Sequence, residues 1–281
     1  EFSMKLIEAN QLAGMNIHYR YFSFEYFLES QLRAGFQNIE LWAGSPHFFL
    51  SNLEYDDCRK FSRMARERGL NIKVITPENC SVPYHFAAAD PDLYRRSFEY
   101  FKKGLDAGEE LGCQIMAVHS GRGNLDQDRE EAWKRGCDML ARLAEYANGK
   151  GITLAMESLR PQETNLGVTL ADVKRMMDEI NHPNFKAMID TCAMGVSGET
   201  PEQWFNCLGD ENIIHMHFID GTPYGHLIWG DGKHNLENWL KTLKKHNYKG
   251  LLSQEITAIE YCFDPAAADI RNYQQFKPFM E

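Results

Sequence analysis

The spacings typical of disulfide frameworks and zinc ribbons are missing from this sequence of 281 residues. It has seven cysteines, an odd number, and none of them forms a CxxC pair. Scattered thiols of this kind predict neither a disulfide framework nor a structural zinc site. We therefore expect reduced cysteines and a cytoplasmic protein. The thiols are those of Cys58, Cys80, Cys113, Cys137, Cys192, Cys207 and Cys262.

Membrane and export signals are also absent from the sequence. No apolar run approaches the roughly 18 residues that a membrane span needs. The first residues lack the basic and apolar regions of a secretory leader, and residues 1–3, which precede Met4, resemble a vector-derived extension. We expect no membrane partner.

Positive charge is scarce, and so are signs of a domain boundary. The formal net charge is −10, and no stretch gathers enough Lys and Arg to neutralise a row of phosphates, so nucleic acid is not an expected partner. No linker rich in Pro, Gly or Ser divides the chain. Hydrophobic residues make up 43% of the sequence, which is enough for a full core. We expect one domain over residues 4–281.

The sequence does contain a regular alternation of two patterns. Short apolar or β-branched runs predict strands at about 13–18, 37–42, 71–76, 114–119, 152–157, 185–190, 212–217 and 250–255. Amphipathic segments predict helices at about 23–35, 54–69, 91–111, 127–149, 169–181, 200–208, 235–247 and 264–279. Gly35 and Gly112 stand where left-handed helix C-caps are expected. Strand followed by helix eight times over predicts an α/β protein, a (β/α)8 TIM barrel. An open doubly wound sheet is the alternative, and the lack of a GxGxxG turn after the first strand argues against it.

Four consecutive predicted strands end in side chains that can bind a metal: Glu157, Asp190, His217 and Glu255. One such residue alone is more often a helix cap or a salt-bridge partner. Together, however, three carboxylates at the mouth of a barrel would repel one another unless a cation held them. Mostly oxygen ligands suit Mn²⁺, Mg²⁺ or Co²⁺. We expect His217 to be the ligand and His215, one layer deeper, to be buried; the reverse assignment is the alternative.

These residues lie within segments that resemble a known family. The segments are IELWAGSPHFF (39–49), ITPENCSVPYHF (75–86), MESLRPQETN (156–165), MIDTCAM (188–194), HMHFID (215–220), WGDGK (229–233) and QEIT (254–257). Together they resemble the xylose isomerase-like barrels, specifically the ketose 3-epimerases, with the strongest likeness to the fructoselysine 3-epimerase branch. The likeness extends over nearly the whole chain.

The resemblance implies a metal-dependent carbohydrate epimerase, an isomerase, with a small-molecule sugar as substrate. It implies Glu157, Asp190, His217 and Glu255 as metal ligands, with Mn²⁺ as the first choice and Co²⁺, Mg²⁺, Ni²⁺ or Zn²⁺ as alternatives. Glu157 and Glu255 would double as acid and base, removing a proton at C3 and returning it on the other face through an enediolate that the metal stabilises. Glu163 matches a substrate-contacting glutamate. A homodimer or homotetramer is implied.

Two positions depart from the tagatose and psicose epimerases. A histidine three residues after the metal-binding aspartate is replaced by Ala193, and an arginine before the Gly-x-Gly turn is replaced by His226. Both missing groups contact the sugar in that family. A substituted, fructoselysine-like ketose or a differently oriented one is therefore expected, with His226 as a substrate contact.

Further substrate contacts are expected on the rim at the carboxyl ends of the strands: His119, Glu78, His47 and Trp42. Each has an ordinary structural alternative, since His119 suits a structural hydrogen bond, Trp42 suits the core, and rim residues are often only solvated.

Three other functions fit the same barrel. A C-glycoside deglycosidase-type lyase subunit would also remove a proton beside a carbonyl. An apurinic endonuclease IV-like repair enzyme would share the four ligand positions but needs extra histidines and a cationic groove. A sugar-binding barrel without catalysis is the third.

Overall fold

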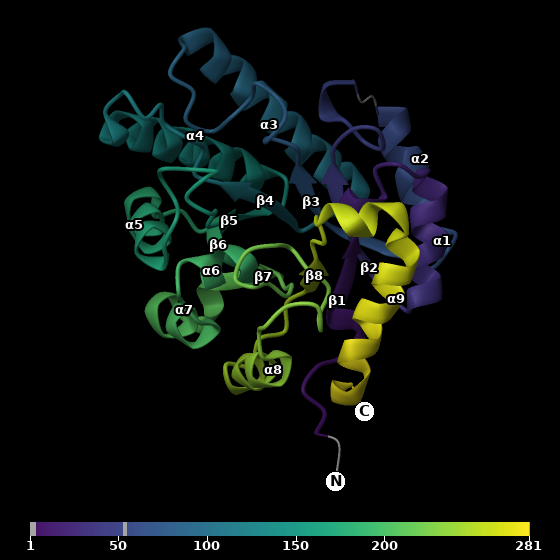
Figure 1. Ribbon diagram of the computed structural model, residues 1–281. Helices are drawn as coiled ribbons and strands as arrows, with labels where there is room; N and C mark the ends of the chain where they lie inside the picture. The colour runs from purple at the N-terminus through teal and green to yellow at the C-terminus, as the bar shows by residue number, and fades with distance from the viewer. Residues whose placement is uncertain (1–3, 53–54, 281) are drawn as a thin grey trace.

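A closed barrel of parallel strands forms the centre of the molecule (Figure 1). The computed structural model describes residues 4–52 and 55–280, so residues 1–3 lie outside the described part. Within this part eight strands pair in chain order, and β1 closes the barrel by pairing with β8. The strands are β1 (Leu12–Met15), β2 (Asn38–Ala43), β3 (Asn71–Pro77), β4 (Ile115–His119), β5 (Thr153–Glu157), β6 (Phe185–Asp190), β7 (Ile213–His217) and β8 (Leu252–Gln254). The predicted (β/α)8 barrel is confirmed.

Helices surround the barrel and cover the outer face of its strands (Figure 1). The α-helices of the described residues are α1 (Phe24–Ala34), α2 (Tyr55–Arg66), α3 (Pro91–Leu111), α4 (Arg129–Gly149), α5 (Leu170–Ile180), α6 (Thr191–Val196), α7 (Pro201–Leu208), α8 (Leu236–Lys245) and α9 (Pro265–Phe276). Short 3-10 turns are η1 (Ala9–Gln11), η2 (Ile17–Tyr19), η3 (Leu50–Asn52), η4 (Asp210–Asn212), η5 (Ile259–Phe263) and η6 (Lys277–Phe279). The sequence pattern did not predict α6, which is too short to show a helical period.

Local signals explain where these helices begin and end. Asp90 caps α3 by accepting a hydrogen bond from the Leu93 backbone N–H, and Pro91 fits the first helical turn. Gly35 and Gly112 end α1 and α3 with φ of +113° and +81°, the left-handed conformation that glycine adopts at low cost.

The core has two parts, as a barrel requires. Outside the strands, one continuous cluster packs between sheet and helices, and it includes the fully buried rings of Trp133 and Trp204. Inside the barrel, Ala117, Ala155 and Met188 form a small separate cluster from β4, β5 and β6. The small inner residues fill the barrel below its polar mouth.

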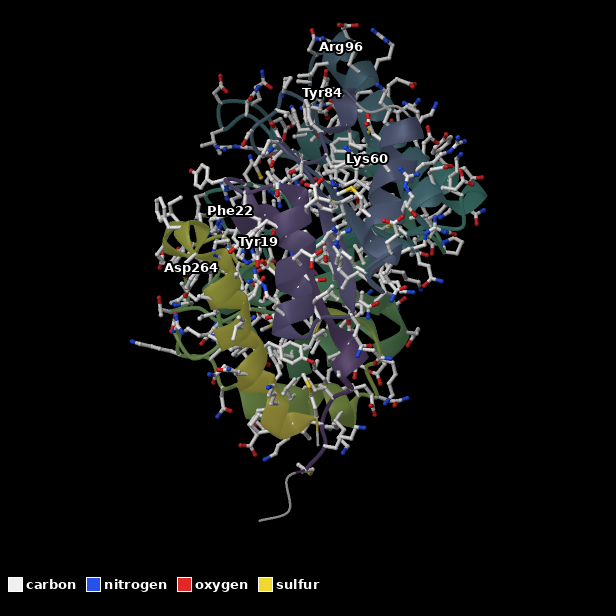
Figure 2. All side chains as sticks on the ribbon, turned by 90° about the vertical axis from the view of Figure 1, so that its right-hand side faces the viewer. Tyr19, Phe22, Lys60, Tyr84, Arg96 and Asp264 are labelled. Carbon is white, nitrogen blue, oxygen red and sulfur yellow. The ribbon has the colours of Figure 1, made fainter. Side chains whose placement is uncertain are left out.

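A buried polar group joins the first helix to the last. The Asp269 carboxylate on α9 accepts hydrogen bonds from Tyr19 (2.6 Å) and Gln31 (2.7 Å), and His18 Nε2 lies 2.8 Å from it. Figure 2 shows Tyr19 and Phe22 on the same side of the barrel as the beginning of α9. These contacts fix the loop after β1, which lies at the rim of the cavity described below.

The helices of residues 4–52 and 55–280 do not have the character of membrane spans. None of them is both long enough and apolar enough to span a bilayer. All seven cysteines are free thiols in the structure.

Candidate functional site

A cavity of about 540 Å³ opens at the carboxyl ends of the strands. Its lining includes Glu157 at the end of β5, Asp190 at the end of β6 and Glu255 directly after β8. This is the end of a (β/α)8 barrel where loops and strand ends assemble binding sites.

The four strand-end residues meet around one point at the base of this cavity. Glu157, Asp190, His217 and Glu255 each offer one ligand atom, and these four atoms lie within 4.8 Å of one another. His217 Nδ1 lies 2.7 Å from a Glu157 oxygen, 3.1 Å from a Glu255 oxygen and 3.7 Å from an Asp190 oxygen. The structure therefore brings together all four residues that the sequence singles out as metal ligands.

The two histidines of β7 occupy different layers. His217 directs Nδ1 toward the three carboxylates, whereas His215 Nε2 contacts the buried Glu40 carboxylate at 2.5 Å. Both rings are fully buried. Among the described residues, the metal-competent group that contains Glu157, Asp190 and Glu255 includes His217, whereas His215 belongs to a separate group with Glu40 and His217.

The electrostatics of the four residues fit a divalent cation. Burial, together with the Glu255 and Asp190 carboxylates, raises the pKa of Glu157 well above its ordinary value, although His217 opposes this. Burial lowers the pKa of His217, but Glu255, Glu40 and Glu157 outweigh it and raise the pKa well above the usual range. Buried carboxylates held this close repel one another, and a dication offsets that cost. Three carboxylates and an imidazole are thus a suitable donor set for a hard or borderline divalent ion.

The two carboxylate oxygens of Asp190 have different partners, one in helix α6 and one in the site. Its Oδ1 accepts the Ala193 backbone N–H at 2.8 Å and so caps α6. Its Oδ2 faces the site and lies 3.2 Å from His226 Nε2, which is also 3.3 Å from a Glu255 oxygen. Burial lowers the pKa of His226, but Asp190 outweighs it and raises this pKa to about 9. His226 thus lies beside two of the ligand candidates, on the cavity wall.

Glu163 reaches the cavity from the loop after β5 and is paired with Arg160. The Arg160 guanidinium donates to both Glu163 oxygens, at 2.9 and 2.8 Å, and the Arg160 backbone N–H donates at 3.0 Å. Burial raises the pKa of Glu163, but these Arg160 contacts outweigh it and leave the pKa lowered, so the group is a carboxylate. Sequence reasoning identified Glu163 but missed its partner.

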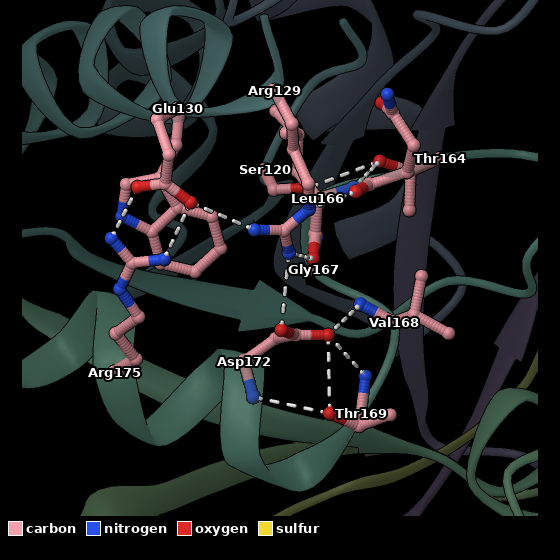
Figure 3. Close-up of polar contacts among 12 residues, drawn as sticks. Ser120, Arg129, Glu130, Thr164, Leu166, Gly167, Val168, Thr169, Asp172 and Arg175 are labelled. Atoms are coloured by element: carbon pink, nitrogen blue, oxygen red, sulfur yellow. Dashed lines mark hydrogen bonds and ion pairs between the residues drawn. The ribbon is translucent and has the colours of Figure 1, made fainter. Parts of the chain in front are cut away.

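The same loop is anchored to the helices behind it (Figure 3). Arg129 on α4 donates to the backbone oxygens of Asn165 and Leu166, at 2.8 and 3.1 Å, and to the Asp172 carboxylate at 3.2 Å. The other Asp172 oxygen accepts the backbone N–H of Thr169 at 3.0 Å. These bonds hold the end of the loop and thereby fix the position of Glu163.

The remaining predicted contacts differ in where they lie. His119 lines the cavity; its Nδ1 accepts the Gly121 backbone N–H at 3.1 Å, and burial lowers its pKa to about 4, so the ring is neutral. Trp42 and Glu78 also line the cavity, and the indole N–H donates to the Glu78 carboxylate at 3.1 Å.

His47 is placed outside the cavity lining. Its Nε2 donates to the Phe22 carbonyl at 2.7 Å, and its Nδ1 lies 3.2 Å from the Asn16 amide. Both ring nitrogens therefore contact the segment between β1 and α1, to which Asn16 and Phe22 belong. His47 thus links the loop after β2 to the segment after β1, and a substrate contact through it stays a prediction.

Asp220 shows what the WGDGK segment does. Its carboxylate accepts backbone N–H groups from Gly221, Gly230, Gly232 and His234 at 2.8 to 3.1 Å. A Cβ on Gly232 would lie only 2.2 Å from an Asp220 oxygen, so this turn requires glycine. The turn closes the loop that positions His226, and spacing alone did not reveal this role.

Comparison with known proteins places this fold in a family. A family model described as xylose isomerase-like TIM barrel matches residues 30–275. Fructoselysine 3-epimerase of Escherichia coli O157:H7 is 26% identical over 248 residues, which cover 88% of this chain and 90% of that protein. A "Probable endonuclease 4" of Thermoplasma acidophilum is 27% identical over 176 residues, 63% of this chain and 54% of that protein.

A solved structure agrees in fold. The D-psicose 3-epimerase of Clostridium cellulolyticum H10, determined with D-tagatose, superposes with a TM-score of 0.80 at 16% identity, covering 96% of this chain and 99% of that one. Fold and site thus define a (β/α)8 barrel with an acidic site at the carboxyl ends of its strands. The chain belongs to the xylose isomerase-like TIM barrel family.

Proposed function

We propose that the protein is a metal-dependent isomerase that epimerises a substituted ketose at C3. The observation that carries this proposal is the convergence of Glu157, Asp190, His217 and Glu255 within 4.8 Å at the base of the cavity. Similarity to fructoselysine 3-epimerase over 88% of the chain supports the choice of reaction. A nucleic-acid substrate is disfavoured by the net charge of −10.

Glu157 and Glu255 are the proposed acid and base. Glu157 ends β5 and Glu255 follows β8, two strands that are not neighbours in the barrel, and both carboxylates line the cavity. One carboxylate takes the proton from the carbon beside the ketone, and the other returns a proton to the opposite face. A divalent cation, when bound, supplies Lewis-acid stabilisation of the negative charge that develops on the substrate oxygens.

Neighbouring side chains would orient the sugar. His119 accepts a backbone N–H on Nδ1, so its neutral ring carries the proton on Nε2 and can donate to a substrate oxygen. Glu163, fixed by Arg160, can accept hydrogen bonds from hydroxyl groups. His226, with Trp42 and Glu78 on the rim, completes the proposed sugar contacts.

Arg20 supports a substituted rather than a plain ketose. It is one of two arginines in the cavity lining; the other, Arg160, is neutralised by Glu163. The Arg20 Nε donates to the Ile17 carbonyl at 3.2 Å, and among the described residues no carboxylate forms an ion pair with its guanidinium. An arginine with free donors at the rim suits an anionic substituent such as a carboxylate.

Further properties belong to the same proposal. Mn²⁺ is the proposed ion, because mostly carboxylate ligands suit a hard or borderline cation. A homodimer or homotetramer is proposed from the family resemblance. A cytoplasmic location is proposed because it fits seven free thiols.

The test is turnover of a panel of ketoses and ketosamines by the Mn²⁺-loaded protein and its Glu157→Gln and Glu255→Gln variants. General acid or base action contributes roughly 10²–10⁴ in rate, so each variant should lose at least about a hundredfold in kcat while it keeps its fold and its metal. Glu199→Gln is the matched control, because Glu199 bonds Leu170 and Trp204 away from the cavity. Normal turnover by metal-loaded Glu157→Gln would refute the two-glutamate scheme.

A further inference from the structure

Glu40 is a buried carboxylate directly beneath the four ligand candidates. It lies on β2, and its side chain has no exposed surface. One oxygen is 2.8 Å from His217 Nε2, and the other is 2.5 Å from His215 Nε2. The Thr76 hydroxyl donates to the oxygen that faces His217. Neither acid–base chemistry nor substrate contact explains a residue at this depth.

Glu40 determines the tautomer that His217 takes when a cation, rather than a proton, lies between Nδ1 and the Glu157 and Glu255 carboxylates. A carboxylate accepts hydrogen bonds and does not donate them, so the His217 nitrogen facing it carries a proton. In a neutral imidazole the other nitrogen then holds a lone pair. That other nitrogen is Nδ1, which faces the oxygens of Glu157 and Glu255.

Burying a carboxylate such as Glu40 is unfavourable, because the charged group loses its water. Removing an ion from water is costly even where hydrogen bonds compensate, and apolar side chains of similar volume often stabilise as well or better. Glu40 nonetheless receives contacts from Thr76 on β3 and from two histidines of β7. Because each oxygen faces a different histidine, the carboxylate is held against rotation.

We infer that Glu40 is a positioning residue for the metal: it fixes the ring and the tautomer of His217 so that Nδ1 can ligate a divalent cation. His215 contributes by holding the second Glu40 oxygen, and its Nε2 also lies 3.4 Å from the Ser253 hydroxyl. This gives the inward-facing His215 a function although it does not reach the cavity. The inference rests on the proposed metal site.

The first experiment measures Mn²⁺ affinity by calorimetry on chelator-treated protein. Partners of metal-bound histidines typically contribute about 10–100-fold in metal affinity. Glu40→Gln should therefore raise Kd by about 10–100-fold, because the amide keeps only one acceptor oxygen for the two histidine N–H groups that the carboxylate bonds. Glu40→Asp keeps the negative charge but places it farther from the two histidines, so Kd should rise by a smaller factor. Glu199→Gln, a Glu-to-Gln change outside the site, should bind as the unaltered protein does, and circular dichroism checks that each variant is folded.

A second measurement needs no substitution. Nitrogen-15 spectra of histidine-labelled protein loaded with diamagnetic Zn²⁺ report which ring nitrogen of His217 carries the proton. A proton on Nε2 with Nδ1 bound to zinc is the expected result. A proton on Nδ1, or a Glu40 variant that folds and binds Mn²⁺ within twofold of the unaltered protein, would overturn the inference. If the unaltered protein binds no divalent ion, the proposed metal site itself fails, which is a different outcome.

Discussion

Binding of a divalent cation should raise the thermal stability of this protein. The proposed ligands lie at the ends of four different strands and meet only when the barrel closes, so the ion binds the native state and not the unfolded chain. At a free concentration of 100 times Kd, such a ligand stabilises the native state by about 2.7 kcal/mol. Each kcal/mol raises Tm by about 2–4 °C in a domain of roughly this size. The expected increase is therefore about 5–10 °C.

Scanning calorimetry of chelator-treated protein, with and without Mn²⁺, measures this shift. His217→Gln removes the central ligand and should abolish the shift. His182→Gln is the control, because His182 Nε2 contacts Glu145 at 2.9 Å on the surface, away from the cavity. The shift is compared within each variant, since His217→Gln also removes a partner of buried Glu40. An equal shift in His217→Gln, or none in the unaltered protein, would refute the reasoning.

Three further predictions concern the fold and the substrate. Asp269→Ala leaves Tyr19 and Gln31 without a buried acceptor. With about 1–3 kcal/mol lost per orphaned donor, the free energy of unfolding should fall by at least about 2 kcal/mol in denaturant titrations. A smaller change would show that this buried polar group contributes little to stability. Asp220→Ala removes the acceptor of four backbone N–H groups. The loop that positions His226 should then lose its fixed shape, so KM for the substrate should rise while metal stoichiometry is kept. An unchanged KM would count against this role of Asp220. Arg20→Met should raise KM for a carboxylate-bearing ketosamine by roughly tenfold or more, because a lost charge-assisted hydrogen bond costs about 1.5–3 kcal/mol. KM for a neutral ketose should not change. Equal effects on both substrates would exclude an anionic substituent.

The barrel could be predicted from the sequence because local pattern and global fold agree in it. The last residues of β5, β6 and β7 are those that the apolar runs indicate: Glu157, Asp190 and His217. Strand ends in a closed parallel barrel face one mouth, so the meeting of these residues follows from topology. The limits of β1 and β8 differ most: β1 ends at Met15, three residues before its predicted end, and β8 ends at Gln254 and leaves Glu255 just beyond the strand.

The supporting residues could not be predicted in the same way. Glu40 contacts a histidine 175 residues away, and no local spacing encodes such a pair. The acid inside the apolar run of β2 was nevertheless a local signal of an inward-facing polar residue. Side chains alternate along a strand, so Glu40 lies on the same side of β2 as Trp42, which lines the cavity. His47 is the opposite case: it lies in a rim loop, as its position in the sequence indicates, but its hydrogen bonds to Asn16 and Phe22 hold it outside the cavity lining.

The most direct test of the account is solvent exchange. The Mn²⁺-loaded protein is incubated in D₂O with a ketosamine that bears a carboxylate, and the sugar is followed by proton NMR. We expect the C3 epimer to appear with deuterium at C3, and both label and epimer to vanish in Glu157→Gln and Glu255→Gln. Epimer that forms without deuterium at C3, or label that persists in both variants, would contradict the claim that two glutamates at one metal site exchange this proton.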